Sequence, residues 1–172
     1  MKSKIKLAAG LSAALAAGAL FSPLTGASAG HLNVLEETDL RGRNEVATGA
    51  TTSKNVGDRN GRGEAYVFGI DNDATTLCYV LTVEKIAPAT AAHIHEGKPG
   101  ENGPVVANLA APADGNAADC LTEGEVGPGT TPKFPTGETV REILANPGDY
   151  YVNVHNAEFP GGAIRGQLKI QS

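Results

Sequence analysis

Apolar side chains in this sequence recur at every second position over short runs, and turn-forming residues bound each run. A period of two is typical of half-buried β-strands, because successive side chains of a strand point to opposite faces. Runs 65–70 and 77–84 alternate in this way, and residues 71–74 between them suit a tight connection, so we predict a β-hairpin. The residues that share a face are Tyr66, Phe68 and Ile70 in the first run and Leu77, Tyr79, Leu81 and Val83 in the second.

Two further strands are predicted near the C-terminus. Residues 150–155 form one of them, with Val152 and Val154 as its core residues. Residues 163–170 form the other. Its alternation directs Ile164, Leu168 and Ile170 inward and Arg165, Gln167 and Lys169 outward.

One segment has a helical period instead. Val140, Ile143 and Leu144 stand at positions i, i+3 and i+4, which favours a short helix near 137–146 with Thr136 as its N-cap. Residues 111–135 are rich in Gly, Pro and polar residues and show little periodicity, so we expect a long surface loop there. The predicted fold is therefore all-β and mostly antiparallel, a sandwich or barrel with one short helix.

The first 29 residues have the form of an export signal. Three lysines precede an apolar run from Leu7 to Phe21, and Ala27-Ser28-Ala29 supplies a small-residue cleavage site. The apolar run is about 15 residues long, shorter than the roughly 18 that a membrane-spanning helix needs. We therefore expect residues 1–29 to be removed and the mature chain to be secreted into the extracellular space, with no transmembrane segment.

The charge of the mature chain is acidic. Without the three lysines of the signal, 11 basic residues face 19 acidic ones, a net charge of −8. Nucleic-acid binding depends on many clustered Lys and Arg residues, so this balance argues against nucleic acid as a partner and favours cations. The mature length suits a single domain with one core.

Cys78 and Cys120 are the only cysteines. Disulfides persist outside the cell membrane, and two cysteines allow one pairing, so we expect a Cys78–Cys120 disulfide. Closing a loop of about 40 residues is worth roughly 3–4 kcal/mol in the chain-entropy model. Two buried free thiols are the alternative.

Four motifs along the mature chain occur in a familiar order. They are LRGRNEV at 40–46, AHIHEG at 92–97 followed by NGPVV at 102–106, YVNVH at 151–155 and FPGGAIRGQL at 159–168. Together they resemble the chordin-type (CHRD) domain. The resemblance implies an extracellular Greek-key β-sandwich or barrel, similar in arrangement to immunoglobulin or superoxide dismutase folds, and brings no established enzymatic activity. The expected organisation is a signal peptide at 1–29, an N-terminal mature segment at 30–39 and a CHRD domain at 40–170.

Three histidines are the chemically richest feature of the sequence. His93 and His95 stand at i and i+2 of an alternating run, so their rings project from one face while Ile94 points into the core. In the strand 150–155 the same logic directs His155 outward. Three neutral imidazoles on one patch suit Cu²⁺ or Zn²⁺. We therefore treat His93, His95 and His155 as a candidate copper or zinc site, with Glu96 and Arg165 as its outer neighbours.

The run from His93 to Gly97 is also similar to the copper-binding strand of Cu,Zn superoxide dismutases, and Val154-His155 and Arg165 extend the similarity. However, His31 is the only other histidine, and no histidine-rich zinc loop follows. This second resemblance therefore implies at most a copper-like half site.

A purely structural role fits the same histidines. They could hydrogen-bond to backbone groups or to Glu96 and hold the Gly-rich loop 97–103 in place, and Arg165 could pair with Glu96 or Glu158. No Gly-x-Ser-x-Gly, Ser-x-x-Lys or His-Glu-x-x-His motif supplies a catalytic centre. We expect a non-enzymatic binding module with an extracellular protein or cell-wall ligand. A copper-dependent redox protein and a cell-surface structural or adhesion protein are the alternatives.

Overall fold

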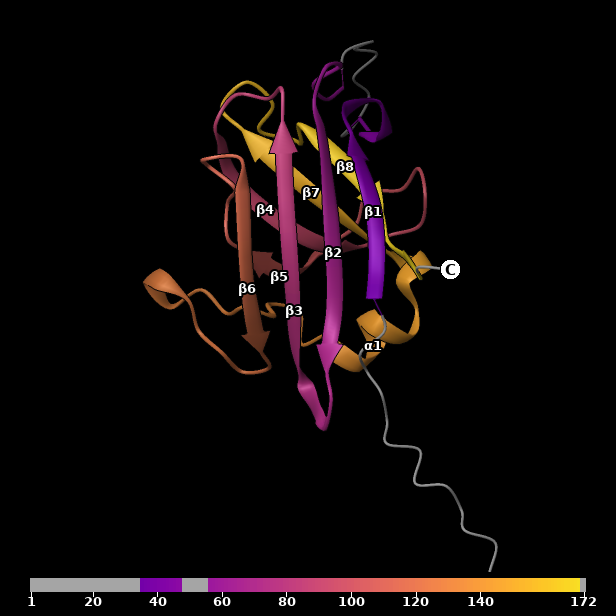
Figure 1. The fold of residues 1–172 in the computed structure, drawn as a ribbon, viewed down its shortest axis with the longest axis vertical. Helices are drawn as coiled ribbons and strands as arrows, with labels where there is room; N and C mark the ends of the chain where they lie inside the picture. Colours follow the sequence, from indigo (N-terminus) through magenta and orange to yellow (C-terminus); the bar gives the residue numbers. More distant parts are fainter. Residues whose placement is uncertain (1–34, 48–55, 171–172) are drawn as a thin grey trace, which may run out of the picture.

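The computed structural model describes residues 35–47 and 56–170, and the predicted signal segment 1–29 and His31 lie outside them. The strands form one antiparallel sheet in the order β5-β4-β7-β8-β1-β2-β3-β6, with β9 paired to β1 (Figure 1). The sheet curls into a nearly closed barrel, which confirms the predicted all-β, mostly antiparallel fold. The strands are β1 (Leu35–Arg41), β2 (Arg62–Ile70), β3 (Asp73–Glu84), β4 (Ala89–Glu96), β5 (Val105–Leu109), β6 (Asn116–Thr122), β7 (Tyr150–Asn156), β8 (Ile164–Gln167) and β9 (Lys169–Ile170). The helical elements are η1 (Gly42–Asn44), η2 (Pro128–Thr130), α1 (Val140–Ala145) and η3 (Pro147–Asp149).

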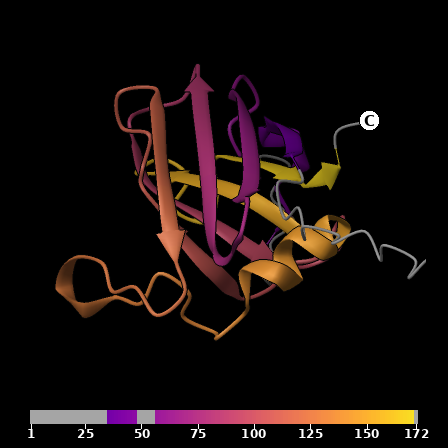
Figure 2. The same ribbon diagram turned by 60° about the horizontal axis from the view of Figure 1, so that its bottom comes forward.

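The strands of the barrel lie in two layers that cross at an angle. In Figures 1 and 2, β1, β2, β3 and β6 form one layer, and β4, β5, β7 and β8 form the other. The inward side chains of both layers form the core. In β3 the predicted alternation is confirmed, since Leu77 and Tyr79 are buried while Val80 is exposed. Other fully buried core residues are Leu40, Val67, Ile94, Val106, Leu121, Val152, Val154 and Ile164.

Strands β2 and β3 form the predicted hairpin, with residues 71 and 72 as its turn. Asn72 has a φ of 63°, a left-handed conformation that Asn tolerates better than most residues. Tyr66, Phe68 and Ile70 share one face as predicted. That face is the outer surface of the barrel, because Val67 between them is the residue that fills the core.

Helix α1 is shorter than the predicted helix and begins later. The prediction placed it near 137–146 with Thr136 as the N-cap, but the helix spans Val140–Ala145 and Thr139 is the N-cap. Gly137 has a φ of 77°, which a right-handed helix cannot include. Thr139 and Glu142 form a reciprocal capping box. In the described part of the chain, no helix is long and apolar enough to cross a membrane.

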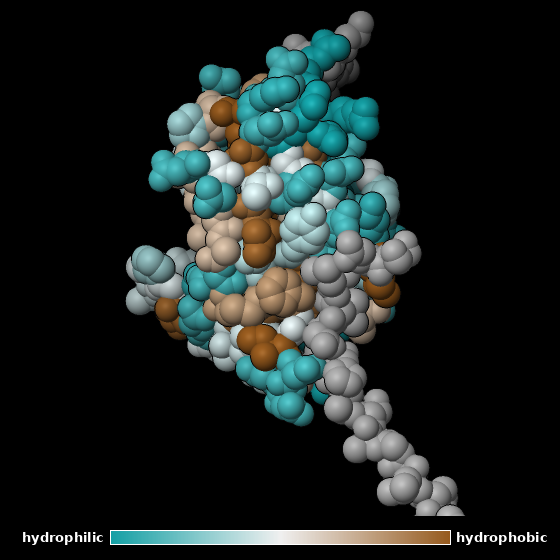
Figure 3. Space-filling view, in the orientation of Figure 1, coloured by the Kyte–Doolittle hydropathy of each residue, from teal (hydrophilic) through white to brown (hydrophobic). Residues whose placement is uncertain are grey.

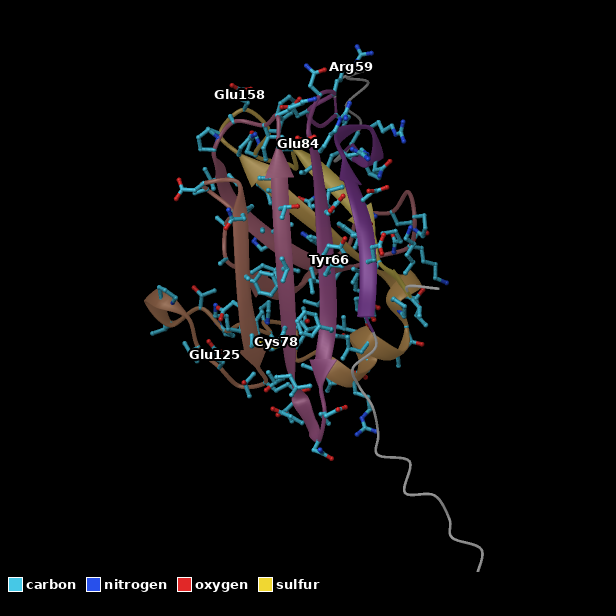
Figure 4. All side chains as sticks on the ribbon, in the orientation of Figure 1. Arg59, Tyr66, Cys78, Glu84, Glu125 and Glu158 are labelled. Carbon is cyan, nitrogen blue, oxygen red and sulfur yellow. A yellow bond between two sulfur atoms is a disulfide. The ribbon has the colours of Figure 1, made fainter. Side chains whose placement is uncertain are left out.

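The prediction of one long surface loop at 111–135 is wrong, because strand β6 lies within these residues. Leu121 is the one buried residue of β6, so no apolar alternation marks this strand in the sequence. It pairs with β3 along its length, with Cys120 opposite Cys78, and these two residues form the predicted disulfide (Figure 4). The disulfide therefore fastens an edge strand to the barrel.

The C-terminal run is divided into β8 and β9. Ile164 and Leu168 face the core as predicted. Ile170 is 59% exposed, so its predicted inward direction is wrong. Strand β9 has two residues and, among the described strands, pairs only with β1, so the core does not extend to it. Arg165 faces outward as predicted and is nevertheless 2% exposed, because other side chains cover it.

A carboxyl group lies in the barrel interior. Glu36 of β1 is fully buried, and neither of its carboxyl oxygens has a hydrogen-bond partner among the described residues. Burial raises the pKa of Glu36 to about 8, so the group is protonated at neutral pH.

We predict that the Cys78→Ser/Cys120→Ser variant folds but loses roughly 3–4 kcal/mol of unfolding free energy. The two cysteines are 42 residues apart, and without the bond β6 is held by its hydrogen bonds to β3 and by the buried side chain of Leu121. Denaturant unfolding of the variant and the wild type measures the difference. A loss below about 1 kcal/mol would contradict the prediction.

We predict that Glu36→Gln changes how stability depends on pH. Since the native pKa of Glu36 lies above its unfolded value, the native state binds the extra proton, and the wild type loses stability as pH rises towards about 8. The variant should gain on the order of 2–4 kcal/mol over the wild type between pH 5 and pH 9. Denaturant unfolding at both pH values tests this. Glu64→Gln, at an exposed position, is the control, and an equal difference at both pH values would refute the prediction.

Candidate metal centre

The three candidate histidines lie together on the outer face of β4 and β7. Nitrogen atoms of His93, His95 and His155, one from each ring, are all within 4.8 Å of one another. Their ring centroids are 4.9 Å apart for His93 and His155, 5.5 Å for His93 and His95, and 6.4 Å for His95 and His155. The structure thus brings together every predicted ligand, and pleat alternation on two strands is the reason.

The strand register explains this proximity. His93 stands opposite Asn153 of the neighbouring strand β7, and His95 stands opposite Tyr151. His155 stands opposite Ala91, whose methyl group leaves room for the imidazole to reach diagonally towards His93. The resulting contact is short, with His93 Nδ1 only 3.1 Å from His155 Nε2.

Backbone carbonyl groups fix the orientation of two of the rings. His95 Nδ1 lies 3.0 Å from the carbonyl oxygen of Gly103, and His155 Nδ1 lies 3.1 Å from that of Pro160. A carbonyl oxygen can only accept, so both Nδ1 atoms carry the proton and donate it. In the neutral rings, both Nε2 atoms are then left with free lone pairs, the atoms a metal ion binds.

The Nε2 lone pairs of His155 and His95 differ in whether they accept a hydrogen bond. His155 Nε2 accepts from His93 Nδ1, which is the donor of that pair because His155 has no proton left at Nε2. His95 Nε2 is buried and has no hydrogen-bond partner in the described part of the chain. An unpaired buried acceptor is unfavourable, and a bound cation would satisfy it.

All three rings are held in the neutral form. Burial lowers the pKa of His93 to about 4, and the neighbouring His155 and His95 act in the same direction. Burial also lowers the pKa of His95 and of His155, although the carbonyl groups that accept from them oppose the shift. Neutral imidazole is the form that coordinates metal.

A stack of three flat groups supports His95. The imidazole of His95 is parallel to the Tyr151 ring, with centroids 4.8 Å apart and planes 5° apart. The guanidinium of Arg165 covers the same ring 3.3 Å from its centroid. Arg165 also donates to Asn102 Oδ1 and to the Lys98 carbonyl, so the predicted outer neighbour acts through Tyr151 and not by direct contact.

The loop between β4 and β5 closes over this stack. Its Gly103 accepts from His95 and donates its own N–H to the Tyr151 hydroxyl at 3.3 Å. A Cβ at Gly103 would lie 1.7 Å from the Glu96 carbonyl oxygen, so only glycine permits this loop path. Gln167 of β8 donates to the Gly97 carbonyl and fastens the start of the loop.

A carboxyl group binds to Asn153, the Cα partner of His93. Asn153 Nδ2 donates to both carboxyl oxygens of Glu45, at 2.9 and 3.0 Å. Burial raises the pKa of Glu45 to about 7, although this hydrogen bond and the charge of Arg165 act to lower it. A Cβ at Gly162 would lie 2.4 Å from Glu45, so a glycine also makes room for this group.

The predicted second neighbour, Glu96, does not support the rings. Its side chain is exposed, and alternation along β4 places it on the face opposite to His95. The structural interpretation named backbone groups or Glu96 as partners of the histidines, and backbone carbonyls accept from His95 and His155. Sequence reasoning missed Tyr151 and Asn153 as neighbours of the site, although their place on the histidine face of 150–155 was the available signal.

The arrangement supplies three nitrogen donors and leaves other coordination positions to water or a ligand. Ligands of a tetrahedral metal at about 2.0–2.1 Å are about 3.3–3.4 Å apart. The His93–His155 pair is close to that separation at 3.1 Å. Coordination through His93 Nδ1 requires its proton to move to Nε2, after which the pair no longer shares a hydrogen bond.

Comparison with known protein families matches the CHRD domain over residues 37–168. This range contains β1 from its third residue, all of β2 to β8 and the histidine cluster with its surrounding residues. A search of curated proteins finds no match. The family match covers well over half of the sequence and agrees with the nearly closed antiparallel barrel and with the order of the four sequence motifs. The chain therefore belongs to the CHRD domain family.

Proposed function

We propose that this protein is an exported, non-enzymatic extracellular binding module that holds Cu²⁺ or Zn²⁺ at His93, His95 and His155. The metal would be the part of the site that meets a ligand, because three imidazoles leave at least one coordination position open. Copper is expected to bind more tightly than zinc at an all-nitrogen site.

One observation carries the metal proposal: the lone pair of His95 Nε2 is buried, unpaired and close to the nitrogens of two other imidazoles. A histidine that only braces a loop needs one hydrogen bond, and its other nitrogen does not have to be buried without a partner. Here carbonyl groups fix the protons of two rings at Nδ1, which is how metalloproteins preset a ligand for coordination through Nε2.

Export is supported by two independent features. The first 29 residues have the three parts of a signal peptide. The Cys78–Cys120 disulfide is a bond that persists in an oxidising compartment and is rare in the cytosol. We infer an extracellular location, where the partner would be a protein or a cell-wall component.

The bracing role remains the competing interpretation, because His95 and His155 do hydrogen-bond to the loops at Gly103 and Pro160. The two roles differ in their dependence on metal. Bracing predicts equal stability of the protein with and without added metal. Coordination predicts that Cu²⁺ or Zn²⁺ raises the unfolding free energy by RT ln(1 + [metal]/Kd), and the melting temperature rises with it.

We predict that purified protein binds Cu²⁺ with one-to-one stoichiometry and that each of His93→Ala, His95→Ala and His155→Ala weakens binding. Loss of an outer-shell partner costs roughly 10–100-fold in metal affinity, so loss of a ligand should cost at least that much. Calorimetric titration measures the affinity, and circular dichroism of each metal-free variant checks that the barrel is retained.

The matched control is His31→Ala, which removes the fourth histidine of the chain. Its affinity should equal that of the wild type. Wild-type affinity in the combined variant His93→Ala/His95→Ala/His155→Ala, or loss of binding in the His31→Ala variant, would show that the metal binds elsewhere. Superoxide-dismutating activity in the copper-loaded protein, absent from the metal-free protein, would favour a copper-dependent redox protein over a binding module.

We also predict that the metal-free protein shows the Nδ1–H tautomer for all three clustered histidines at pH 7. Carbonyl acceptors hold the proton of His95 and of His155 at Nδ1. His155 Nε2 then accepts from His93, which holds the proton of His93 at Nδ1 as well. Two-bond ¹H–¹⁵N correlation spectra distinguish the tautomers. Addition of Zn²⁺ should move the proton of His93 to Nε2. An Nε2–H tautomer of His95 in the metal-free protein would contradict the assignment.

A further inference from the structure

Four arginines line one hollow at an end of the barrel, although the chain as a whole has a negative net charge. The hollow has a volume of about 350 Å³ and is formed by Arg41, Gly42, Arg43, Arg59, Gly61 and Arg62. No acidic residue is among these lining residues. Arg59 lies at the top of Figure 4, at the end of the molecule that is hydrophilic in Figure 3.

The fold brings these arginines together from two separate segments. Arg41 and Arg43 flank Gly42 at the end of β1, and Arg59 and Arg62 flank the start of β2. A Cβ at Gly42 would lie 1.7 Å from the Asp58 carbonyl oxygen, so only glycine lets the two segments pack this closely. The arginine hollow is therefore a consequence of a tight backbone contact.

Arg41 and Arg62 lie beside each other as Cα partners across β1 and β2. Arg62 is also the Cα partner of Glu84 on β3, and Glu64 and Glu84 line the neighbouring hollow together with Arg41 and Arg62. Within the described part of the chain, the guanidinium groups of Arg43, Arg59 and Arg62 have no hydrogen-bond or ion-pair partner. Arg41 has one distant contact, 3.7 Å from Asp39.

A bound anion would pair with the guanidinium groups of the hollow. These groups match phosphate oxygens in pairs, and a tetrahedral phosphate offers more acceptor oxygens to several arginines than a carboxylate does. The volume lies in the range of about 300–1,000 Å³ found for small-ligand sites. The arginines are confined to one hollow and do not extend as a stripe, so they fit a single group or a short run of groups and not a duplex.

We propose that this arginine hollow binds a phosphate group, either free or carried by an extracellular polymer. The site is separate from the histidine cluster and shares no lining residue with it. A module with both sites would hold a cation at one place on the barrel and an anionic ligand at another.

The test uses the whole exported protein and two probes, inorganic pyrophosphate and a polyphosphate chain. Affinity is measured by calorimetry at several salt concentrations. The variant Arg59→Gln/Arg62→Gln changes two exposed side chains and leaves the Gly42 contact intact. The control Arg141→Gln/Lys169→Gln removes the same charge at exposed positions outside the hollow.

The proposal predicts binding that falls at least about tenfold in the hollow variant, weakens with rising salt, and changes less than about twofold in the control. Binding of pyrophosphate identifies a free phosphate group as a sufficient ligand, whereas binding of polyphosphate alone identifies a polymer. No binding of either probe, or an equal loss in both variants, would overturn the proposal. The metal titration is independent of these results, so either proposal can fail alone.

Discussion

The strand register of the barrel determines where the polar side chains on the outer face of its strands lie. One row of directly paired residues runs across the outer surface through seven strands, from β3 to β5. The members face outward because the strand residues next to them face inward, so the core and the polar row are set by one alternation. In order, the row is Glu84, Arg62, Arg41, Arg165, Asn153, His93 and Asn108. A slip of one residue in any strand would remove its member from the row and put a polar side chain into the core.

The centre of this row is buried although it lies on the outer face. Arg165 and Asn153 are 2% and 4% exposed because the β4–β5 loop and the segment that carries Glu45 cover them. Covering a polar row is unfavourable unless each group is paired. Asn153 Nδ2 holds Glu45, and Arg165 holds Asn102 and stacks on Tyr151, but Asn153 Oδ1 and His95 Nε2 have no hydrogen-bond partner among the described residues. Of these two acceptors, His95 belongs to the cluster of three imidazoles, so a metal ion bound there would satisfy it.

Alternation in the sequence was sufficient for the hairpin, for the core face of β7 and for the grouping of the three histidines. Alternation failed where the pattern of apolar side chains does not indicate the backbone conformation. In β6 only Leu121 is buried, so a paired edge strand had the composition of a loop. Near α1, the left-handed Gly137 moved the helix start beyond the position that the apolar period indicated. Tyr151, Asn153 and Glu45 joined the site through long-range contacts, and Glu45 is 108 residues from Asn153 in the sequence, a separation that no local pattern can bridge.

The charge of Arg165 has two opposing effects on a cation at the histidines. It lowers the pKa of His95, as burial does, so protons compete less with a metal for the imidazole nitrogens. The same positive charge also repels a bound divalent ion. The Tyr151 ring separates the guanidinium from His95 and presents one π-face to each, and a cation over that face is favourable. Nearby, the carboxyl group of Glu45 is half ionised at a pH of about 7 and adds negative charge as pH rises. The repulsion is therefore weakest above neutral pH, where all three imidazoles are also free of protons.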